Sequence, residues 1–206
     1  MILTKALAIS YSTFILAAIV LYFAWMARAS AGGSADKAEL LVAKPQKTED
    51  PVFGSAILLV KPVANGGHLG FILNKPTTAT LGQIFPEHGP SKKIPDPIYL
   101  GGPDDMNLVF ALVERHGKKK NDAIQITPDM FLAMKAEAVD KIIENEADHA
   151  RFFLGMVVWA PGELEDEVRQ GLWYELEADE KVVFRKKTDG MWEELVRGAQ
   201  MRANAI

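Results

Sequence analysis

The chain has 206 residues, of which 49% are hydrophobic, and it contains no cysteine. A chain without cysteine has no structural disulfide, no cysteine-ligated zinc or iron–sulfur site and no thiol nucleophile. Only Lys5 and Arg28 precede the first acid, Asp36, so residues 36–206 carry 21 bases against 27 acids, a net charge of −6. Since non-specific nucleic-acid binding neutralises phosphates with basic side chains, this balance argues against a nucleic-acid partner.

The N-terminal segment contains 21 consecutive uncharged residues, 6–26. As a helix this stretch would be about 31 Å long, enough to cross the core of a bilayer, and Tyr22 and Trp25 lie near its end, where interfacial aromatics are expected. We therefore expect residues 1–28 to be a single-pass anchor in the inner (cytoplasmic) membrane. The flanking basic residues favour a cytoplasmic position for the domain that follows.

A cleavable signal peptide is the alternative interpretation of the same segment. Ala29-Ser30-Ala31 has the small-x-small form of a cleavage site, and cleavage near Ala31 would leave a periplasmic or secreted domain. Residues 29–38 are small and polar and are expected to form a flexible linker. We expect residues 39–206 to form the folded domain.

The first half of this domain consists of predicted strands separated by turns. Asn65-Gly66 indicates a hairpin because both residue types tolerate a positive φ, and Thr80 is expected to cap a short helix over residues 80–85. Pro, Gly, Ser and Lys between residues 87 and 97 predict an exposed loop. Apolar runs between these breakers predict strands at residues 40–43, 55–60, 69–73, 98–100 and 108–113.

The second half alternates predicted strands and helices. Thr127-Pro128-Asp129 offers a cap, a proline at the first helical position and an acid in the first turn, so we expect a helix from there to about Glu146. Ala160-Pro161-Gly162 is expected to turn into an acidic helix that ends at Gly171, and an amphipathic helix is expected at residues 191–201. Apolar runs predict strands at residues 123–126, 151–159, 173–176 and 182–184.

Strands that occur both as hairpins and after helices predict an α+β fold rather than a repeating βαβ pattern. We expect a compact single domain around a mixed, largely antiparallel β-sheet, with helices packed on it and a hydrophobic helix before it.

Few residues in the domain indicate a specific chemistry. No two of the four histidines have metal-ligand spacing on one element. Asp104, Asp105 and Glu163 offer oxygen ligands to a hard cation such as Mg²⁺, although a solvated turn and stabilisation of a helix dipole explain them more simply. The glycines of 66–70 connect two strands instead of opening a helix, which excludes a phosphate-binding loop. We expect no cofactor and assign no catalytic residue.

Six motifs in one order resemble the AlgH/YqgE family of bacterial proteins. The resemblance runs from about Leu40 to about Leu195 and implies an α+β domain around a mixed sheet. It implies a transcriptional regulator as one possible function, and it supplies no catalytic residues. Lys75 stands where the family usually has arginine. The motifs are Leu41-Val42-Ala43-x-Pro45, Asp50-Pro51-x-Phe53-x-Ser55, Gly70-Phe71-Ile72-Leu73-Asn74-Lys75-Pro76, Thr80-Leu81, Tyr99-Leu100-Gly101-Gly102-Pro103 and Trp159-Ala160-Pro161-Gly162-Glu163-Leu164-Glu165-x-Glu167.

These features together favour a membrane-tethered, non-enzymatic binding or regulatory domain with a protein partner. Two alternatives stay open: a transcriptional regulator that binds DNA, and a metal-assisted hydrolase that uses Asp104, Asp105 and Glu163. Motifs at strand ends and turns are where a scaffold usually presents its function. The candidate binding residues are Asn74, Lys75, Pro76, Gly101, Gly102, Pro103, Trp159 and Gly162.

Overall fold

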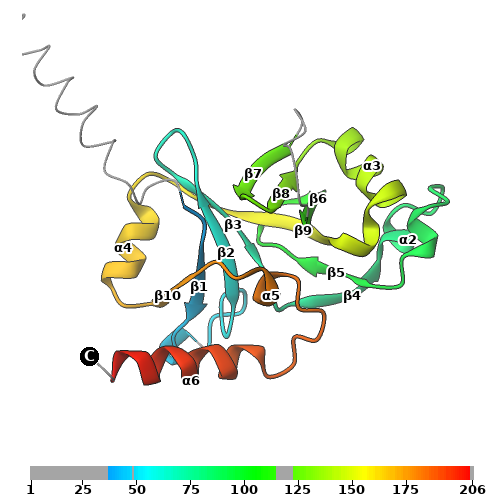
Figure 1. Ribbon diagram of the computed structural model, residues 1–206. Helices are drawn as coiled ribbons and strands as arrows, with labels where there is room; N and C mark the ends of the chain where they lie inside the picture. Colours follow the sequence, from blue (N-terminus) through cyan, green and yellow to red (C-terminus); the bar gives the residue numbers. More distant parts are fainter. Residues whose placement is uncertain (1–36, 48, 115–122, 205–206) are drawn as a thin grey trace, which may run out of the picture. The chain divides into compact units, whose positions relative to one another are not determined.

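The computed structural model describes residues 37–47, 49–114 and 123–204 (Figure 1). The expected membrane segment, residues 6–26, and most of the expected linker lie outside these ranges. None of the described helices combines the length and the apolar character that crossing a bilayer requires.

Four antiparallel strands form the first half of the sheet. Residues of the Ile57–Val60 run alternate between two core clusters: Ile57 and Leu59 face one, and Leu58 and Val60 face the other. This strand is therefore buried on both faces, as its continuous apolar run predicts. In spatial order the four strands are β10 (Trp173–Glu177), β1 (Glu39–Ala43), β2 (Ile57–Pro62) and β3 (His68–Ile72).

The second half of the sheet contains one parallel pair. The strand β5 (Pro97–Leu100) runs parallel to β9 (Ala150–Trp159), whereas every other pairing described is antiparallel. The expectation of a mixed, largely antiparallel sheet is thus confirmed. The remaining strands of this half are β4 (Pro76–Thr80), β6 (Asp104–Glu114), β7 (Ala123–Thr127) and β8 (Met130–Ala133).

The strand β9 belongs to both halves of the sheet, as Figure 1 shows for the yellow arrow. Its first residues pair with β5 and β6, and its last residues, Val157–Trp159, pair with β3. Between the two parts, Gly155 has a φ of +68°, a left-handed conformation that glycine adopts most readily. The change of partner along one strand joins the two halves into one ten-stranded sheet.

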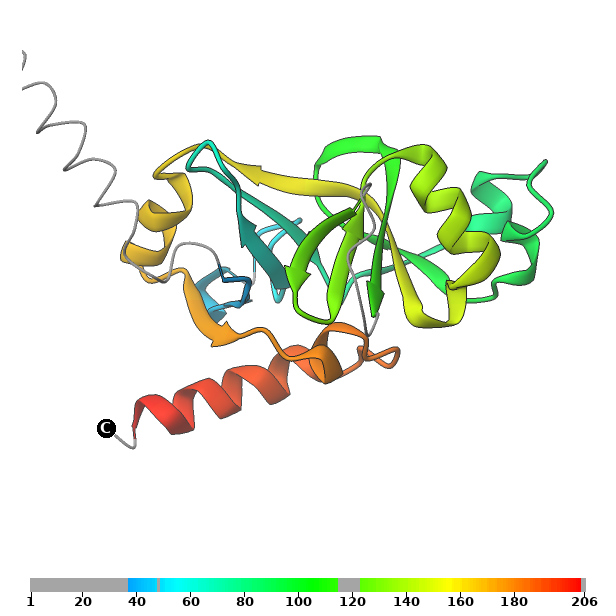
Figure 2. The same cartoon turned by 45° about the horizontal axis from the view of Figure 1, so that its top comes forward.

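The helices pack against the sheet through their apolar side chains. Val139, Ile142 and Ile143 lie on one face of α3 (Ala136–Asn145) and pack in a cluster with Phe152 of β9. Figure 2 shows the long helix α6 beside β10. The helices are α2 (Leu81–Ile84), α3, α4 (Glu163–Arg169), α5 (Glu180–Val183) and α6 (Met191–Ala203), with 3₁₀ turns η1 (Pro45–Lys47), η2 (Ser91–Lys93) and η3 (Ala147–His149).

Several predicted boundaries are confirmed. The Thr80 N–H donates to the Gln83 side-chain oxygen at 2.9 Å, which closes the first turn of α2. Gly66 has a φ of +83° in the hairpin between β2 and β3, and Gly171 has a φ of +73° after α4. A hairpin turn and the end of a helix are positions where a left-handed backbone conformation is common.

The helix expected from Thr127 is wrong in its first half. The chain forms the β7–β8 hairpin there, and α3 begins only at Ala136. All four residues of β8 are buried, between β6 on one side and β7 on the other. A continuous apolar run fits a strand buried on both faces as well as a helix, and here sheet pairing outweighed the local helix-start signal.

The strand expected at residues 182–184 is also wrong, because Val182 and Val183 end the short helix α5. The Asp179 carboxylate accepts a hydrogen bond from the Lys181 N–H at 2.9 Å and caps this helix. Val183 is fully buried in the largest core cluster, so tertiary packing holds a β-branched pair in a helical turn.

Candidate functional site

Asn74 and Lys75 hold a neighbouring loop in place. The Asn74 amide accepts a hydrogen bond from the Ile57 N–H and donates one to the Ser55 carbonyl, both at 2.8 Å. The Lys75 ammonium donates to the Val52 carbonyl at 2.6 Å, and its partial burial lowers the Lys75 pKa. Both side chains therefore bind the chain's own backbone, whereas the adjacent Pro76 is exposed.

Gly101, Gly102 and Gly155 form a close backbone contact that we call the glycine crossing. Gly101 and Gly102 are buried. A Cβ atom would lie 2.1 Å from the Gly155 carbonyl oxygen if built on Gly101, and 2.2 Å from the Met156 carbonyl oxygen if built on Gly102. No side chain fits at such distances, so the paired glycines allow the segment after β5 to cross the bend in β9.

Trp159 and Gly162 lie at the other end of β3 from Asn74. Trp159 is buried, and a Cβ built on Gly70 would lie 2.9 Å from its ring. Gly162 is exposed and starts α4 with a φ of +86°. The predicted residues thus form two groups. Residues 74–76 and 101–103 are neighbours, since the Leu100 N–H donates to the Lys75 carbonyl, while 159–162 lie beside the hairpin that contains Gly66.

Two of the three carboxylates considered for a metal accept hydrogen bonds from backbone N–H groups. Asp104 accepts from the Val158 N–H at 3.0 Å, and Glu163 accepts from the Ala160 N–H at 2.9 Å. Asp105 has a φ of +50°. Within the described parts of the chain, no three His, Asp or Glu side chains are arranged to hold a metal ion.

Directly after the glycine crossing, β6 bulges away from β9. Asp104 pairs with Met156 and Val109 pairs with Leu154, so residues 105–108, which we call the arch, stand opposite Gly155 alone. Two apolar side chains of the arch are open to solvent, Met106 at 49% and Leu108 at 44% of their full exposure. Val158 of β9 is 50% exposed, and the Asp104 bond brings its backbone to the base of the arch.

The predicted strand at residues 108–113 did not indicate that its first residue, Leu108, is exposed. The available signal was the Pro103-Asp104-Asp105 segment. Adjacent acids directly before an apolar run mark the point where a strand leaves the buried part of a sheet.

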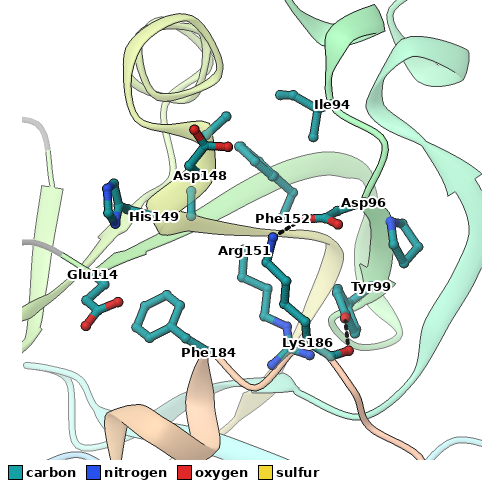
Figure 3. A pocket seen from close by; sticks show the side chains of 13 residues that line it. Ile94, Asp96, Tyr99, Glu114, Asp148, His149, Arg151, Phe152, Phe184 and Lys186 are labelled. Atoms are coloured by element: carbon teal, nitrogen blue, oxygen red, sulfur yellow. Dashed lines mark hydrogen bonds and ion pairs between the residues drawn. The ribbon is translucent and has the colours of Figure 1, made fainter.

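A pocket of about 170 Å³ lies at the start of β9, in the second half of the sheet. Figure 3 shows side chains from β5, β9, the η3 turn and the segment after α5 around it. Its apolar wall includes Phe184 and Ile94, and its ionisable residues are Asp96, Glu114, Asp148, His149, Arg151 and Lys186.

Arg151 is the buried charge of this pocket, with only 5% of its surface exposed. Its Nη1 donates to the Val183 carbonyl and its Nη2 donates to the Arg185 carbonyl at 3.1 Å, so the guanidinium satisfies carbonyls at the C-terminal end of α5. The guanidinium carbon lies 3.9 Å from the centroid of the Tyr99 ring, a cation–π contact. Burial lowers the Arg151 pKa from its usual value.

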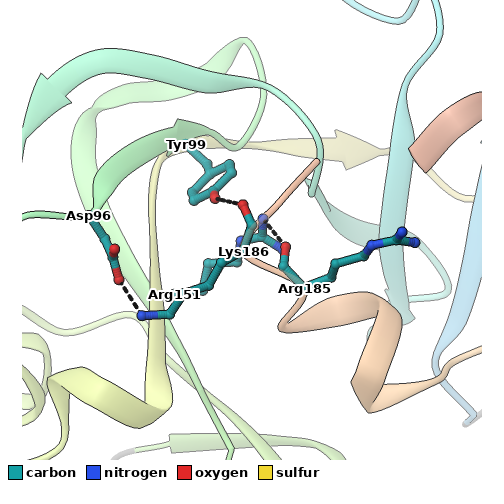
Figure 4. Close-up of polar contacts among 5 residues, drawn as sticks. All are labelled: Asp96, Tyr99, Arg151, Arg185 and Lys186. Atoms are coloured by element: carbon teal, nitrogen blue, oxygen red, sulfur yellow. Dashed lines mark hydrogen bonds and ion pairs between the residues drawn. The ribbon is translucent and has the colours of Figure 1, made fainter. Parts of the chain in front are cut away.

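Two further contacts fix the same segment, as Figure 4 shows. The Tyr99 hydroxyl donates to the Lys186 carbonyl at 3.3 Å, and the Lys186 ammonium lies 2.7 Å from the Asp96 carboxylate. Asp96, Tyr99 and Arg151 therefore fasten the chain between α5 and α6 to β5 and β9. No role was predicted for Arg151; the available signal was a lone basic residue at the start of a long apolar strand.

Comparison with known sequences identifies relatives of unassigned function. The family described as DUF179, AlgH-like, matches residues 40–204. A UPF0301 protein from Chlorobaculum tepidum is 32% identical over 151 residues, which cover 72% of this chain and 79% of that one. A UPF0301 protein from Chlorobaculum parvum is 31% identical over 162 residues, which cover 77% and 84% of the two chains.

Two solved structures have the same fold. The solution structure of the AlgH protein from Pseudomonas aeruginosa is similar with a TM-score of 0.66 and 21% identity, over 82% of this chain and 89% of that one. The crystal structure of a protein from Corynebacterium diphtheriae is similar with a TM-score of 0.65 and 20% identity, over 79% and 86%. The α+β architecture is therefore shared across distant sequences.

Proposed function

We propose that this chain, which belongs to the AlgH-like family, is a membrane-tethered, non-enzymatic domain that binds another protein through the arch. The family assignment rests on the match over residues 40–204 and on relatives above 30% identity. The observation that carries the binding proposal is the exposure of Met106 and Leu108 on a segment that the sheet does not need for pairing.

The arch has the composition of a contact surface. Met106, Leu108 and Val158 are among the most exposed large apolar side chains in the described structure. Clustered apolar exposure marks interaction sites more often than single exposed residues do, and methionine is enriched in protein–protein interfaces. The exposed Asp105 beside them supplies a polar edge of the kind that surrounds interface cores.

A pair of variants of the full, membrane-extracted chain tests this surface by affinity capture. We expect the wild-type chain to retain a specific protein, and Met106→Glu/Leu108→Glu to lose it, because two carboxylates would be desolvated on binding. Met201→Glu is the matched control, since Met201 is 62% exposed on α6. Equal capture by the folded double variant and by the wild type would exclude the arch as the contact.

The tether is supported by the 21 uncharged residues 6–26. We expect the chain to stay with the membrane fraction through alkaline extraction, and deletion of residues 6–26 to release it. The intact mass decides between anchor and signal peptide. A mass that includes residues 1–28 supports the anchor, whereas a mature chain that begins near Gly32 contradicts it.

A further inference from the structure

A pocket distant from the arch in sequence lies beside Arg151. We propose that this pocket binds a small organic monocarboxylate with an apolar body, whose carboxylate pairs with Arg151 and Lys186. The proposal does not depend on the protein partner, because Met106 and Leu108 do not line the pocket.

Arg151 provides the first argument, because its charge is buried, and Asp96, whose negative charge acts on it, is bound to the Lys186 ammonium instead. No carboxylate forms an ion pair with it among the described residues. Its two bonds to backbone carbonyls use two of its five N–H groups. A buried cation is costly unless it is paired, and the guanidinium fork matches a carboxylate in geometry.

Lys186 provides a second cation at the same pocket. Its ammonium is held by Asp96 at 2.7 Å, and both side chains lie at the wall (Figure 3). The Lys186–Asp96 pair is solvent-accessible, and such pairs are weak. A ligand carboxylate can therefore compete with Asp96 for the ammonium at small cost.

Size and charge restrict the class of ligand. The volume of about 170 Å³ is well below the roughly 300–1,000 Å³ of sites for drug-sized molecules, which excludes a nucleotide. Phe184 and Ile94 offer apolar surface to the body of the ligand. Asp96, Glu114 and Asp148 also line the pocket, and their negative charge opposes any anion, most strongly a multiply charged one such as a phosphate ester. A single carboxylate on a small apolar group satisfies all of these conditions.

Benzoate and its neutral isostere benzamide are the probes for a first test with the full chain. We expect saturation-transfer NMR to show saturable benzoate binding, with benzamide at least about tenfold weaker, because only benzoate forms charge-assisted hydrogen bonds. Equal affinity for the two probes, or no saturable benzoate binding, overturns the proposal.

Two variants locate the site without removing Arg151, whose loss would also release the end of α5. Asp96→Asn frees Lys186 and is expected to tighten benzoate binding about two- to fivefold. Ala147→Phe places a ring in the pocket that Ala147 lines and is expected to abolish binding. Asp189→Asn, an exposed position before α6, is the charge control. Benzoate affinities that are the same in Asp96→Asn and in Asp189→Asn, or binding that survives Ala147→Phe, contradict the assignment.

Discussion

The glycine crossing and the arch follow one another in the sequence, yet they have opposite surroundings. Gly101 and Gly102 are buried against the bend of β9, while Met106 and Leu108 are open to solvent. The glycines are the family-like part of this segment, and their carbonyl contacts explain why no other residue fits. The ordered motif thus marks the place where the backbone is most constrained, and the exposed apolar side chains lie next to it.

The largest effect is expected from adding one methyl group at the glycine crossing, which tests its close backbone contact. Gly102→Ala is expected to destabilise the protein by about 2–4 kcal/mol, because its Cβ would lie 2.2 Å from the Met156 carbonyl oxygen. Urea unfolding measures the loss. In Gly198→Ala the new Cβ meets nothing within 4 Å, so this helix variant is expected to gain about 0.5–1 kcal/mol. Similar unfolding curves for the two variants would contradict the close contact.

The Asn74→Ala variant tests whether a residue beside the glycine crossing also stabilises the fold. Asn74→Ala leaves the N–H of the fully buried Ile57 without its acceptor, and we expect a loss of about 1–3 kcal/mol. Asn145→Ala is the control, because the exposed Asn145 amide only donates to the Lys141 carbonyl one turn earlier in α3. A loss in the free energy of unfolding no larger than that of Asn145→Ala would show that Asn74 does not stabilise the fold.

Acid unfolding tests the loop that Lys75 holds. Asp50 accepts hydrogen bonds from the Phe53 and Val52 N–H groups, which lower its pKa below the ordinary 3.8. Because the folded-state pKa is depressed, this stabilisation is present above pH 3.8 and is lost as the pH falls through the lower folded value. The Asp50→Asn variant is expected to lack this pH-dependent loss of stability when urea unfolding is measured at a series of pH values. If the loss of stability on acidification persists in Asp50→Asn, another carboxylate causes it.

The smallest effect on stability is expected at the arch. Met106→Glu/Leu108→Glu is predicted to change the free energy of unfolding by no more than about 0.5 kcal/mol per site, as at other exposed positions. Thermal unfolding of the double variant beside the wild type measures this. A loss above about 2 kcal/mol would show that these side chains pack in the core, and the capture experiment would then need single substitutions.

Local signals predicted most of the fold. The apolar run of β2, the Asn65-Gly66 turn and the Gly171 stop of α4 were each predicted from neighbouring residues, and the structure confirms them. The predictions for β8 and α5 were wrong because the type of each element depends on pairing or packing partners outside the local pattern, such as β6 for β8. Met130–Ala133 is a strand since β6 and β7 pair with it, and no window of the sequence around it contains β6.

The candidate site was less accessible to prediction. Gly101 and Gly102 were expected to present a surface, whereas the contact that buries them comes from Gly155 and Met156, about fifty residues later. Arg151 received no role, because its partners are the backbone carbonyls of Val183 and Arg185. Backbone carbonyls exist at every residue, so the sequence shows a lone base before an apolar strand but does not show which groups that base binds.

The shared strand β9 also determines when this protein can fold during its synthesis. β3 is complete once residue 72 has left the ribosome, but its outer neighbour, β9, ends at Trp159, and β1 waits for Glu177 at the end of β10. Pairings between such distant segments form slowly and leave apolar strands open until the later partner arrives. In the nascent domain one edge of β1 and one edge of β3 thus stay unpaired until residues 173–177 and 157–159 have been made.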